Sequence, residues 1–250
     1  MSQKFPQIHS IRNFSGGLSL TAREHAAITR LPVRRVSFPP DQDIVSKGDR
    51  SNRCVTLVSG FANTSKMAGK GKRQVAALHI AGDMPDLMSM HLERMDCDIR
   101  TMTACEIEFV DHEDLRVLCE NHPRLSFAFW RVTLSDAAIM REWVVNLARR
   151  PALAKLAHFF CEMMVRMDAV GLVENGECDL PLTQEILSDV TGLSAVHINR
   201  TLQVLRSSGF MAFNDGRLAV IEWRQLANLA DFDDAYLHRG NREGTMIARA

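Results

Sequence analysis

The sequence predicts an α+β protein with an N-terminal antiparallel β-roll, one long helix and a C-terminal unit of two short helices and a β-hairpin. Three observations support this fold class. Short β-like runs divided by Gly, Pro and Asp fill residues 33–110, a helical period fills 121–147, and two capped helical segments with a hairpin pattern fill 181–221. With 250 residues, 46% of them hydrophobic, the chain can bury more than one core, and two domains are expected.

The N-terminal part begins with a polar stretch. Residues 1–17 end in two glycines and should form a loose arm, and residues 18–21 open a short helix that reaches Thr29. Turn signals at 47–49, 69–71 and 82–83 then divide β-like runs at the spacing of an all-β roll or barrel. The expected strands are residues 35–38, 43–46, 54–58, 60–63, 74–78, 101–104 and 106–110.

One long helix is expected next, because the apolar period becomes helical after His112 and Pro123 is tolerated in a first turn. The helix is apolar on two sides and therefore needs two partners, the β domain and a second copy of the chain. The alternative is a helix buried wholly in its own domain. One apolar row is Phe127, Trp130 and Leu134, the other contains Val132, Ile139 and Trp143, and the expected dimer contacts are Trp130, Leu134, Ala138, Ile139 and Trp143.

Two short helices joined at a tight corner are predicted over residues 181–209. Thr183 is a suitable N-cap for a first helix through Val190, Gly192 ends it, and Ser194 is a suitable N-cap for the second helix. Such a pair is either a helix-turn-helix that binds DNA or an ordinary αα-hairpin.

The second helix has two different faces. Ile198, Leu202 and Leu205 follow the spacing i, i+4 and i+7, which buries one face against the first helix. A β-hairpin with a turn at 214–217 follows this helix, as in the wing of a winged helix. The opposite face carries Ala195, Val196, Asn199 and Arg200, with His197 and Thr201 at its flank.

Composition limits the possible functions. The 30 Lys and Arg residues balance the 30 Asp and Glu residues, so any DNA contact must come from a local basic patch. The N-terminus lacks the apolar stretch of a signal peptide and no apolar run is long enough to span a bilayer, so a cytoplasmic protein without membrane contact is expected. The six cysteines lack CxxC spacing, and most of them are expected to be small buried hydrophobic residues rather than disulfides or metal ligands.

Five motifs carry a family resemblance: IVSKGD at 44–49, LVSG at 57–60, AGD at 81–83, TACE at 103–106 and LSAVHINRT at 193–201. Together with the order of the elements, they resemble the Crp/Fnr superfamily of bacterial transcription regulators over residues 18–237. The resemblance implies a cyclic-nucleotide-binding-like β-roll sensor domain over 18–120, a dimerisation helix over 121–148, a Crp-type winged helix-turn-helix DNA-binding domain over 149–225 and a C-terminal extension over 226–250.

The resemblance also implies DNA-contacting residues. Thr183 and Gln184, and likewise Ser194 and His197, match phosphate contacts, and Arg200 matches an arginine that donates two hydrogen bonds to guanine. The sequence departs from the family's best-known members at its two other base-reading positions, which hold Ala195 and Val196. These side chains can at most touch a thymine methyl group, so more specificity is expected from DNA shape. Asn199 either contacts an adenine or is a solvated polar residue.

The sensor domain departs further from the family. Members that bind cyclic AMP hold its ribose with Gly-Glu and its phosphate with Arg-Ser, whereas this chain has Gly82-Asp83 and, near the second position, Met95-Asp96. Because a carboxylate there would repel a phosphate, cyclic AMP binding is not expected. The N-terminal arm has no cysteines for an iron–sulfur cluster. His79, His91, Cys97 and Cys105 either hold a metal or haem or are structural, and the structural interpretation is preferred, so no cofactor or metal is expected.

The predicted function is a dimeric, sequence-specific DNA-binding transcription regulator. Its expected partners are double-stranded DNA with an inverted-repeat operator, a second copy of the chain and, for an activator, RNA polymerase. An enzyme is not expected, because no phosphate-binding glycine loop, HExxH or GxSxG motif is present and no catalytic residues are identified. The alternative is a β-roll regulatory protein that acts on a protein partner and has a non-functional DNA-binding domain. Oxidation of Cys178, if exposed, is a further hypothesis for regulation.

Overall fold

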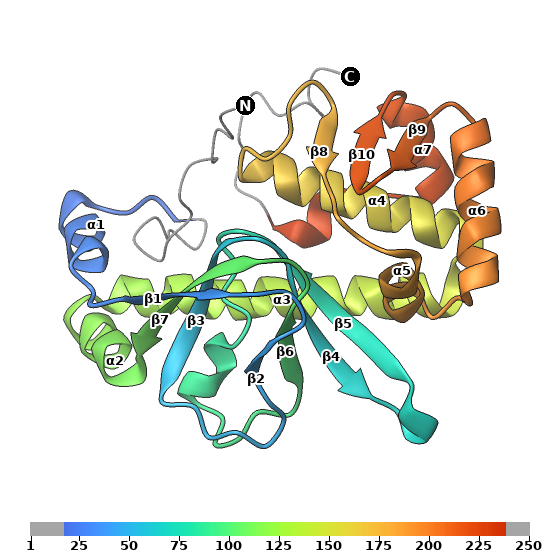
Figure 1. The fold of residues 1–250 in the computed structure, drawn as a ribbon. Coiled ribbons are helices and arrows are strands. Elements are labelled where there is room, and N and C mark those ends of the chain that lie inside the picture. The colour runs from blue at the N-terminus through green and yellow to red at the C-terminus, as the bar shows by residue number, and fades with distance from the viewer. Residues whose placement is uncertain (1–17, 239–250) are drawn as a thin grey trace. The chain divides into compact units, whose positions relative to one another are not determined.

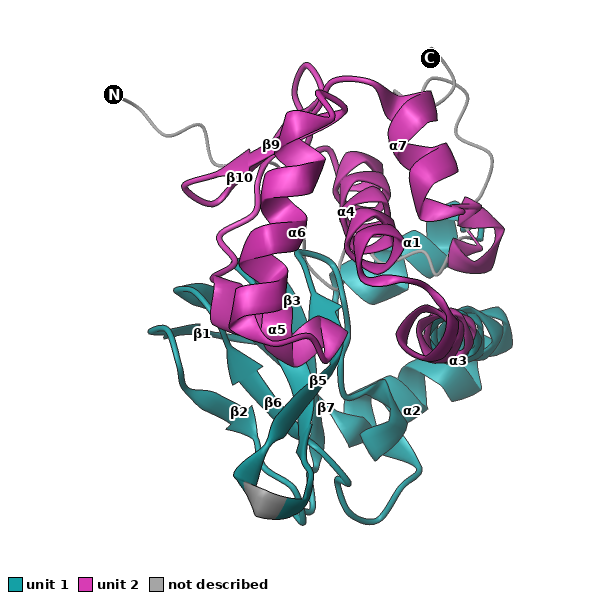
Figure 2. Ribbon diagram, turned by 90° about the vertical axis from the view of Figure 1, so that its right-hand side faces the viewer, with its two compact units in different colours: residues 1–137 teal, residues 138–250 magenta. Residues whose placement is uncertain are grey.

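The computed structural model describes residues 18–238, and the chain divides into two compact units, Met1–Ala137 and Ala138–Ala250 (Figure 2). The division lies inside helix α3 (Pro123–Arg149), which therefore contributes to both units. Pro123 begins this helix, as its position in the sequence predicts, because a first-turn residue needs no backbone N–H. The expected arm at 1–17 lies outside the described residues.

The first unit is an antiparallel β-roll made of two sheets (Figure 1). One sheet has the order β1-β7-β3 and the other β2-β6-β4-β5, and apolar residues from both sheets form a common core that includes Val55, Ile99 and Ile107. The predicted roll and α+β class are thus confirmed. The strands are β1 (Arg34–Phe38), β2 (Asp43–Val45), β3 (Arg53–Ser59), β4 (Ala62–Met67), β5 (Arg73–His79), β6 (Asp98–Thr101) and β7 (Cys105–Asp111).

The prediction of a strand at 101–104 is wrong, because the strand in this region, β6, is Asp98–Thr101. Thr101 is the last residue of β6, which pairs with β2 and β4, and the next two residues turn so that both backbone N–H groups donate to Phe61 O. Gly60 makes this turn possible, since it has φ +88° and a Cβ there would lie 2.4 Å from Ala104 O. The hydrogen bonds to Phe61 O therefore determine the backbone conformation of residues 102 and 103, and the local β propensity does not.

A second core in the first unit packs the helices onto the roll. It joins α1 (Ala22–Thr29), α2 (His112–Asn121), the start of α3 and the short 3-10 helix η3 (Leu87–Met90). Thr21 and Glu24 form a capping box that fixes where α1 begins, close to the predicted start. A further 3-10 turn, η2 (Gly69–Gly71), connects β4 to β5.

The second unit is built around α4 (Ala152–Ala169), of which 12 of 18 residues are buried. Its sheet has the order β8-β10-β9, in which β8 was not predicted. The boundary expected at 225/226 falls inside α7, whose buried Leu226 and Ala230 belong to this unit's core. The other elements are β8 (Glu177–Asp179), α5 (Gln184–Thr191), α6 (Ala195–Ser207), β9 (Met211–Asn214), β10 (Arg217–Val220), α7 (Trp223–Ala230) and η4 (Asp234–Leu237).

Within residues 18–238, no helix combines the length and the apolar composition that crossing a membrane requires.

Candidate nucleic-acid interface

Side-chain caps define both helices of the α5–α6 pair. Thr183 Oγ1 accepts a hydrogen bond from Ile186 N, and Ser194 Oγ accepts one from His197 N at 3.3 Å. Gly192 ends α5 in the left-handed conformation, at φ 69°, which suits a glycine. The predicted helix-turn-helix geometry is present, because these local signals leave the chain few alternatives.

The inner face of α6 is apolar, as its spacing predicts. Ile198, Leu202 and Leu205 are buried, α5 packs against α6, and Leu187 and Val190 of α5 are buried as well. Residues at i, i+4 and i+7 share one side of a helix, so burying this side directs the other side outward.

The outer face of α6 is exposed along its first two turns. Arg200 makes no hydrogen bond or ion pair with any residue of the described part of the chain, so its guanidinium is free to bind a ligand. Thr201, expected at the flank, is instead buried and donates to His197 O at 2.8 Å. The exposed residues on this face are Ala195, Val196, His197, Asn199 and Arg200.

The residues expected at DNA phosphates lie at helix starts. Thr183, Gln184, Ser194 and His197 are all exposed. The two capping hydroxyls use an acceptor lone pair for the cap and keep their O–H groups as donors. The positive end of each helix dipole adds to the attraction for an anion at the same place.

The predicted wing is a β-hairpin of β9 and β10. Asp215 and Gly216 both have positive φ, 50° and 73°, which is the backbone pattern of a two-residue type I′ turn. The guanidinium of Arg206, in the last turn of α6, donates to Phe213 O on β9. This contact fixes the hairpin to the helix whose outer face is exposed.

A buried polar cluster lies in the second unit, where side chains from the second half of α3, α4 and η4 meet. The Glu162 carboxylate accepts hydrogen bonds from Trp143 Nε1 at 2.9 Å and Tyr236 Oη at 2.8 Å, and forms an ion pair with Arg166 at 3.3 Å. The pKa of Glu162 is raised, because burial outweighs these donors. The His158 ring, whose pKa burial lowers to about 3, stacks on Tyr236. This cluster was not predicted from the sequence, because Trp143, Glu162 and Tyr236 are far apart along the chain.

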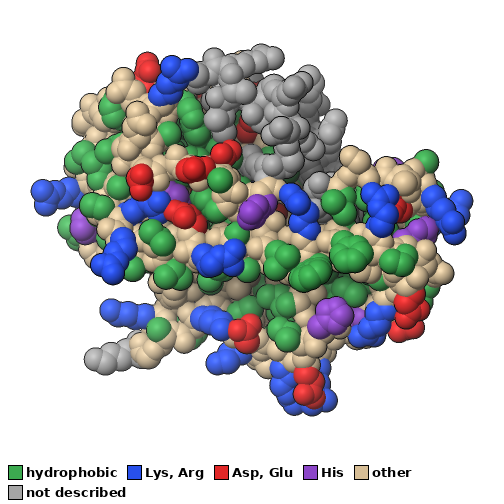
Figure 3. Space-filling view, turned by 180° about the vertical axis from the view of Figure 1, so that it is seen from behind, with side chains coloured by type: hydrophobic (Ala, Val, Ile, Leu, Met, Phe, Trp, Pro, Cys, Tyr) green, Lys and Arg blue, Asp and Glu red, His purple; other side chains and the backbone are tan. Residues whose placement is uncertain are grey.

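The long helix α3 exposes apolar side chains on one side. Trp130 and Leu134, two expected dimer contacts, are exposed, whereas Ile139 is half-buried, and Ala138 and Trp143 lie in the core of the second unit. Figure 3 shows a row of hydrophobic side chains across the face where α3 lies. The exposed row also includes Phe127, which the sequence places in the same apolar row as Trp130 and Leu134, and Val144, which was not predicted. Both follow the heptad positions 127, 130, 134, 137, 141 and 144.

The segment expected at a cyclic nucleotide is packed and carries an acidic group. Gly82 and Asp83 form a turn on β3 through backbone hydrogen bonds to Leu57. Met95 is buried, and the exposed Asp96 carboxylate pairs with Lys66 Nζ at 2.5 Å. Hydrogen bonding to Lys66 holds the pKa of Asp96 below its usual range, so it is a carboxylate at neutral pH.

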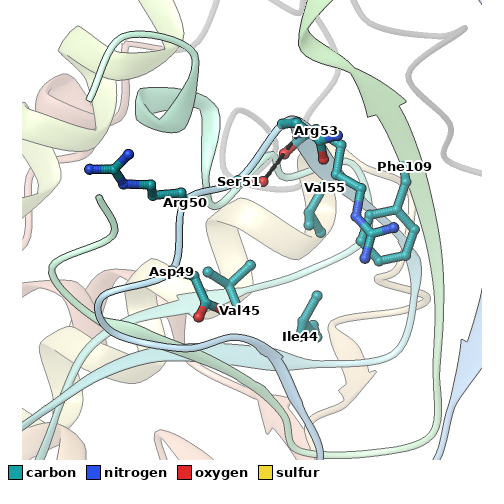
Figure 4. A pocket seen from close by; sticks show the side chains of 9 residues that line it. Ile44, Val45, Asp49, Arg50, Ser51, Arg53, Val55 and Phe109 are labelled. Atoms are coloured by element: carbon teal, nitrogen blue, oxygen red, sulfur yellow. Dashed lines mark hydrogen bonds between the residues drawn. The ribbon is translucent and has the colours of Figure 1, made fainter. Parts of the chain in front are cut away.

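A small cavity of about 220 Å³ lies elsewhere in the first unit, between β2, the loop at 49–53, β3 and β7 (Figure 4). Its lining includes the apolar side chains of Val45 and Val55 and the polar residues of the loop. Arg50 pairs with Glu93 at 2.5 Å, and the guanidinium of Arg53 lies 4.0 Å from the centroid of the Phe109 ring. Both cations that line the cavity are therefore engaged within the protein.

The cysteines are free and buried or half-buried, as the sequence predicts for most of them. All six cysteines are free, five are buried and Cys119 is half-buried. Burial raises the pKa of the Cys178 thiol to about 12, so the exposure that the oxidation hypothesis required is not met. Met84, Met90 and Met95 fill the cores of the first unit. Within residues 18–238, no three His, Cys, Asp or Glu side chains are placed to hold a metal ion together.

Comparisons with known proteins match each unit separately. A family model described as a cyclic nucleotide-binding domain matches residues 35–122, and one described as a Crp-like helix-turn-helix domain matches residues 154–229. The transcriptional activator protein FnrL of Cereibacter sphaeroides is 25% identical over 204 residues, which cover 80% of this chain and 81% of FnrL. The nitrogen fixation regulation protein FixK of Azorhizobium caulinodans is 21% identical over 194 residues, which cover 78% of this chain and 77% of FixK.

The fold is also that of a solved structure. FixK2 from Bradyrhizobium japonicum aligns with a TM-score of 0.70 at 19% identity, covering 80% of this chain and 98% of FixK2. At 80% coverage the likeness includes residues of both units.

Proposed function

Because this chain belongs to the Crp/Fnr superfamily of transcription regulators, we propose that it binds an inverted-repeat operator as a homodimer. The superfamily consists of DNA-binding regulators and not of enzymes.

The outer face of α6 is the observation that carries the proposal. A helix of this size fits the major groove, and α6 presents the exposed Arg200, which has no hydrogen bond or ion pair within residues 18–238, in its second turn. A guanidinium can donate two hydrogen bonds to O6 and N7 of a guanine. Thr183, Gln184, Ser194 and His197 would hold the phosphates beside the groove, and Asn199 lies next to Arg200 within reach of a base edge.

The exposed row on α3 supports association of two copies. Phe127, Trp130, Leu134 and Val144 recur at heptad positions, which is the pattern of a coiled-coil contact. Such a dimer has two-fold symmetry, so its two α6 helices would meet half-sites about one helical turn apart, about 34–36 Å. We assign the dimer contact to this exposed row and not to Ala138 or Trp143, whose side chains are buried within the subunit.

The sensor domain is proposed not to bind cyclic AMP. At the place of the phosphate-binding pair the chain has Met95 and the carboxylate of Asp96, and the nearby Lys66 is already paired with Asp96. A phosphate would have to break that ion pair to gain a cation. A change in this domain is proposed to shift the α3 helices and with them the spacing of the two α6 helices, as a shift between two dimer states.

The similarity to FnrL, which is named a transcriptional activator, extends the proposal to a protein partner. Where this protein activates transcription, that partner is RNA polymerase. The alternative, a regulator of another protein with an inactive DNA-binding domain, is not favoured by any feature of α6.

Selection of binding sites from random duplex DNA tests the proposal. The wild-type protein should enrich an inverted repeat, and Arg200→Ala should lose about 1–3 kcal/mol of binding and relax the preference at one guanine per half-site. Arg224→Ala is the matched control, because Arg224 is also an exposed arginine but lies on α7. Unchanged base preference in Arg200→Ala, or the same loss in the control, would contradict the assignment.

A further inference from the structure

Two arginines of the β-roll lie against the same aromatic ring. The guanidinium carbon of Arg53 lies 4.0 Å from the centroid of the Phe109 ring, and that of Arg34 lies 5.3 Å from it. The strand register accounts for this arrangement. Phe109 on β7 is paired with Arg34 on β1 and with Val55 on β3, and Arg53 is two residues before Val55. Cross-strand partners, and residues two apart in a strand, share one face of a sheet, so both arginines lie on the face that covers the core of the roll.

No acidic side chain neutralises these two arginines. Within residues 18–238 neither guanidinium has a hydrogen bond or an ion pair, and Asp111, which is opposite Arg53 in the strand register, forms no ion pair with it. The two cations are closer together than the about 10 Å over which 0.1 M salt screens a charge. They therefore repel each other, and an anion bound to both would remove this repulsion.

The contact with Phe109 leaves the hydrogen-bonding groups of both arginines available. A cation–π contact holds the positive charge over the ring, and the five N–H groups of a guanidinium can still donate to an acceptor. The neighbouring Arg35 is the contrast, because it lies on the other face of β1 and pairs with the Glu108 carboxylate. Arg34 and Arg53 thus offer free donors beside one apolar ring.

The cavity of about 220 Å³ opens beside Arg53 and the Phe109 ring (Figure 4). Its apolar lining comes from Ile44, Val45 and Val55, and in Figure 4 the side chains of Ile44 and Val55 point toward each other next to that ring. Pockets that hold drug-sized ligands have roughly 300–1,000 Å³, so this cavity is too small for a nucleotide and suits a small organic molecule. No residue of the segment 82–96, at which the family resemblance places a cyclic nucleotide, belongs to its lining.

The other charged residues of the lining face away from this place. In Figure 4 the side chain of Arg50 points away from Arg53, and Arg50 pairs with Glu93. Asp49 lies on the opposite side of the cavity from Arg53, where its carboxylate accepts a hydrogen bond from Ser46 N at 2.8 Å. The electrostatic field at the Phe109 ring is therefore set by the two unpaired arginines.

We propose that this end of the β-roll binds a short-chain organic carboxylate. Its carboxylate group pairs with Arg53 and Arg34, and its apolar chain lies in the cavity against Val45 and Val55. A guanidinium matches the two oxygens of a carboxylate with two parallel N–H groups. Inorganic phosphate would meet the same cations but would bury no apolar surface, so it is expected to bind more weakly. The inference does not depend on the proposed contacts between α6 and DNA.

Isothermal titration calorimetry of the full-length protein tests the site, with sodium butyrate as the probe and the ionic strength held constant. Butyrate should bind once per chain. Acetate, which lacks two CH₂ groups, should bind about 15-fold more weakly, because burial of each CH₂ group is worth about fourfold in affinity. Butyramide has the same shape without the charge and should bind at least about tenfold more weakly than butyrate.

Three variants assign the binding to the two arginines. Arg53→Met and Arg34→Met each remove one cation, keep an apolar side chain and should weaken butyrate binding at least about tenfold. Arg53→Lys should recover only part of the loss, because an ammonium group cannot pair with both carboxylate oxygens in parallel. Arg23→Met is the matched control and should bind butyrate as the wild type does, since Arg23 is an exposed arginine of α1 outside the cavity lining. Circular dichroism verifies that all variants are folded.

Several results would overturn the inference. Absence of binding at millimolar butyrate would contradict it, and so would equal affinities for butyrate and butyramide. Phosphate that binds as tightly as butyrate would reveal a cationic patch that does not use the cavity. Unchanged butyrate binding in both Arg→Met variants, or the same loss in Arg23→Met, would place the ligand elsewhere on the protein. None of these results bears on the assignment of Arg200 to DNA.

Discussion

Truncation of Trp130 to alanine should weaken the homodimer. The side chain is 60% exposed on the row of α3 that we assign to the dimer contact. A tryptophan presents on the order of 200–250 Å², so about 130 Å² per subunit remains for a partner. At about 25 cal/mol per Å² this area is worth about 3 kcal/mol per subunit and about 6 kcal/mol for both, an upper limit because the truncated interface repacks.

If Trp130→Ala loses half of this association free energy, the dimer dissociation constant rises about 100-fold, since each 1.4 kcal/mol is about tenfold. Sedimentation velocity over a range of protein concentrations measures that constant. Met67→Ala is the control, because Met67 at the end of β4 is equally exposed, at 60%, but lies outside the row. An unchanged dissociation constant for Trp130→Ala, or the same weakening in Met67→Ala, would refute the assignment of the interface.

Three further predictions concern stability. Asp86 Oδ1 accepts a hydrogen bond from Val55 N, while Oδ2 has no partner among the described residues, and burial raises the pKa of this carboxyl to about 7. Because the pKa is higher in the folded state than in the unfolded state, the contribution of this group to stability is largest below about pH 4. This contribution is lost as the pH rises through about 7. Asp86→Asn should remove this pH dependence, which amounts to at most about 4 kcal/mol in the free energy of unfolding. Urea unfolding of both proteins at pH 5 and pH 8 measures it. The same difference between the two pH values in the variant and the wild type would contradict the prediction. Tyr236→Phe deletes a buried donor to Glu162 and should cost about 1–3 kcal/mol by thermal unfolding, whereas an unaltered melting temperature would mean that the cluster contributes nothing. Gly60→Ala should destabilise the protein by several kcal/mol, because Gly60 has a positive φ and a backbone oxygen lies 2.4 Å from the added carbon. Gly69→Ala is the control and should change stability by less than about 1 kcal/mol, because its added carbon meets no atom within 4 Å. Equal effects of the two substitutions would count against the steric argument.

Local sequence signals predicted most of the candidate interface. The N-caps Thr183 and Ser194, the break at Gly192 and the turn at 214–217 all act within a few residues of chain. A cap or a tight turn depends on hydrogen bonds and dihedral angles of neighbouring residues, so its position can be inferred without knowing the rest of the fold. The exposed position of Arg200 follows from the same spacing that buries Ile198.

The long helix shows the opposite case. The sequence alone established that α3 is apolar on more than one side, which is a property of its period. Only the tertiary structure decided that Trp143 donates to the buried Glu162 while Trp130 remains exposed, because α4 and η4 cover one side and not the other. Strand β8 and the polar cluster at Tyr236 likewise depend on partners distant in the chain. Periodicity determines which residues share a face, but the element that covers a face is chosen by the packing of the whole unit.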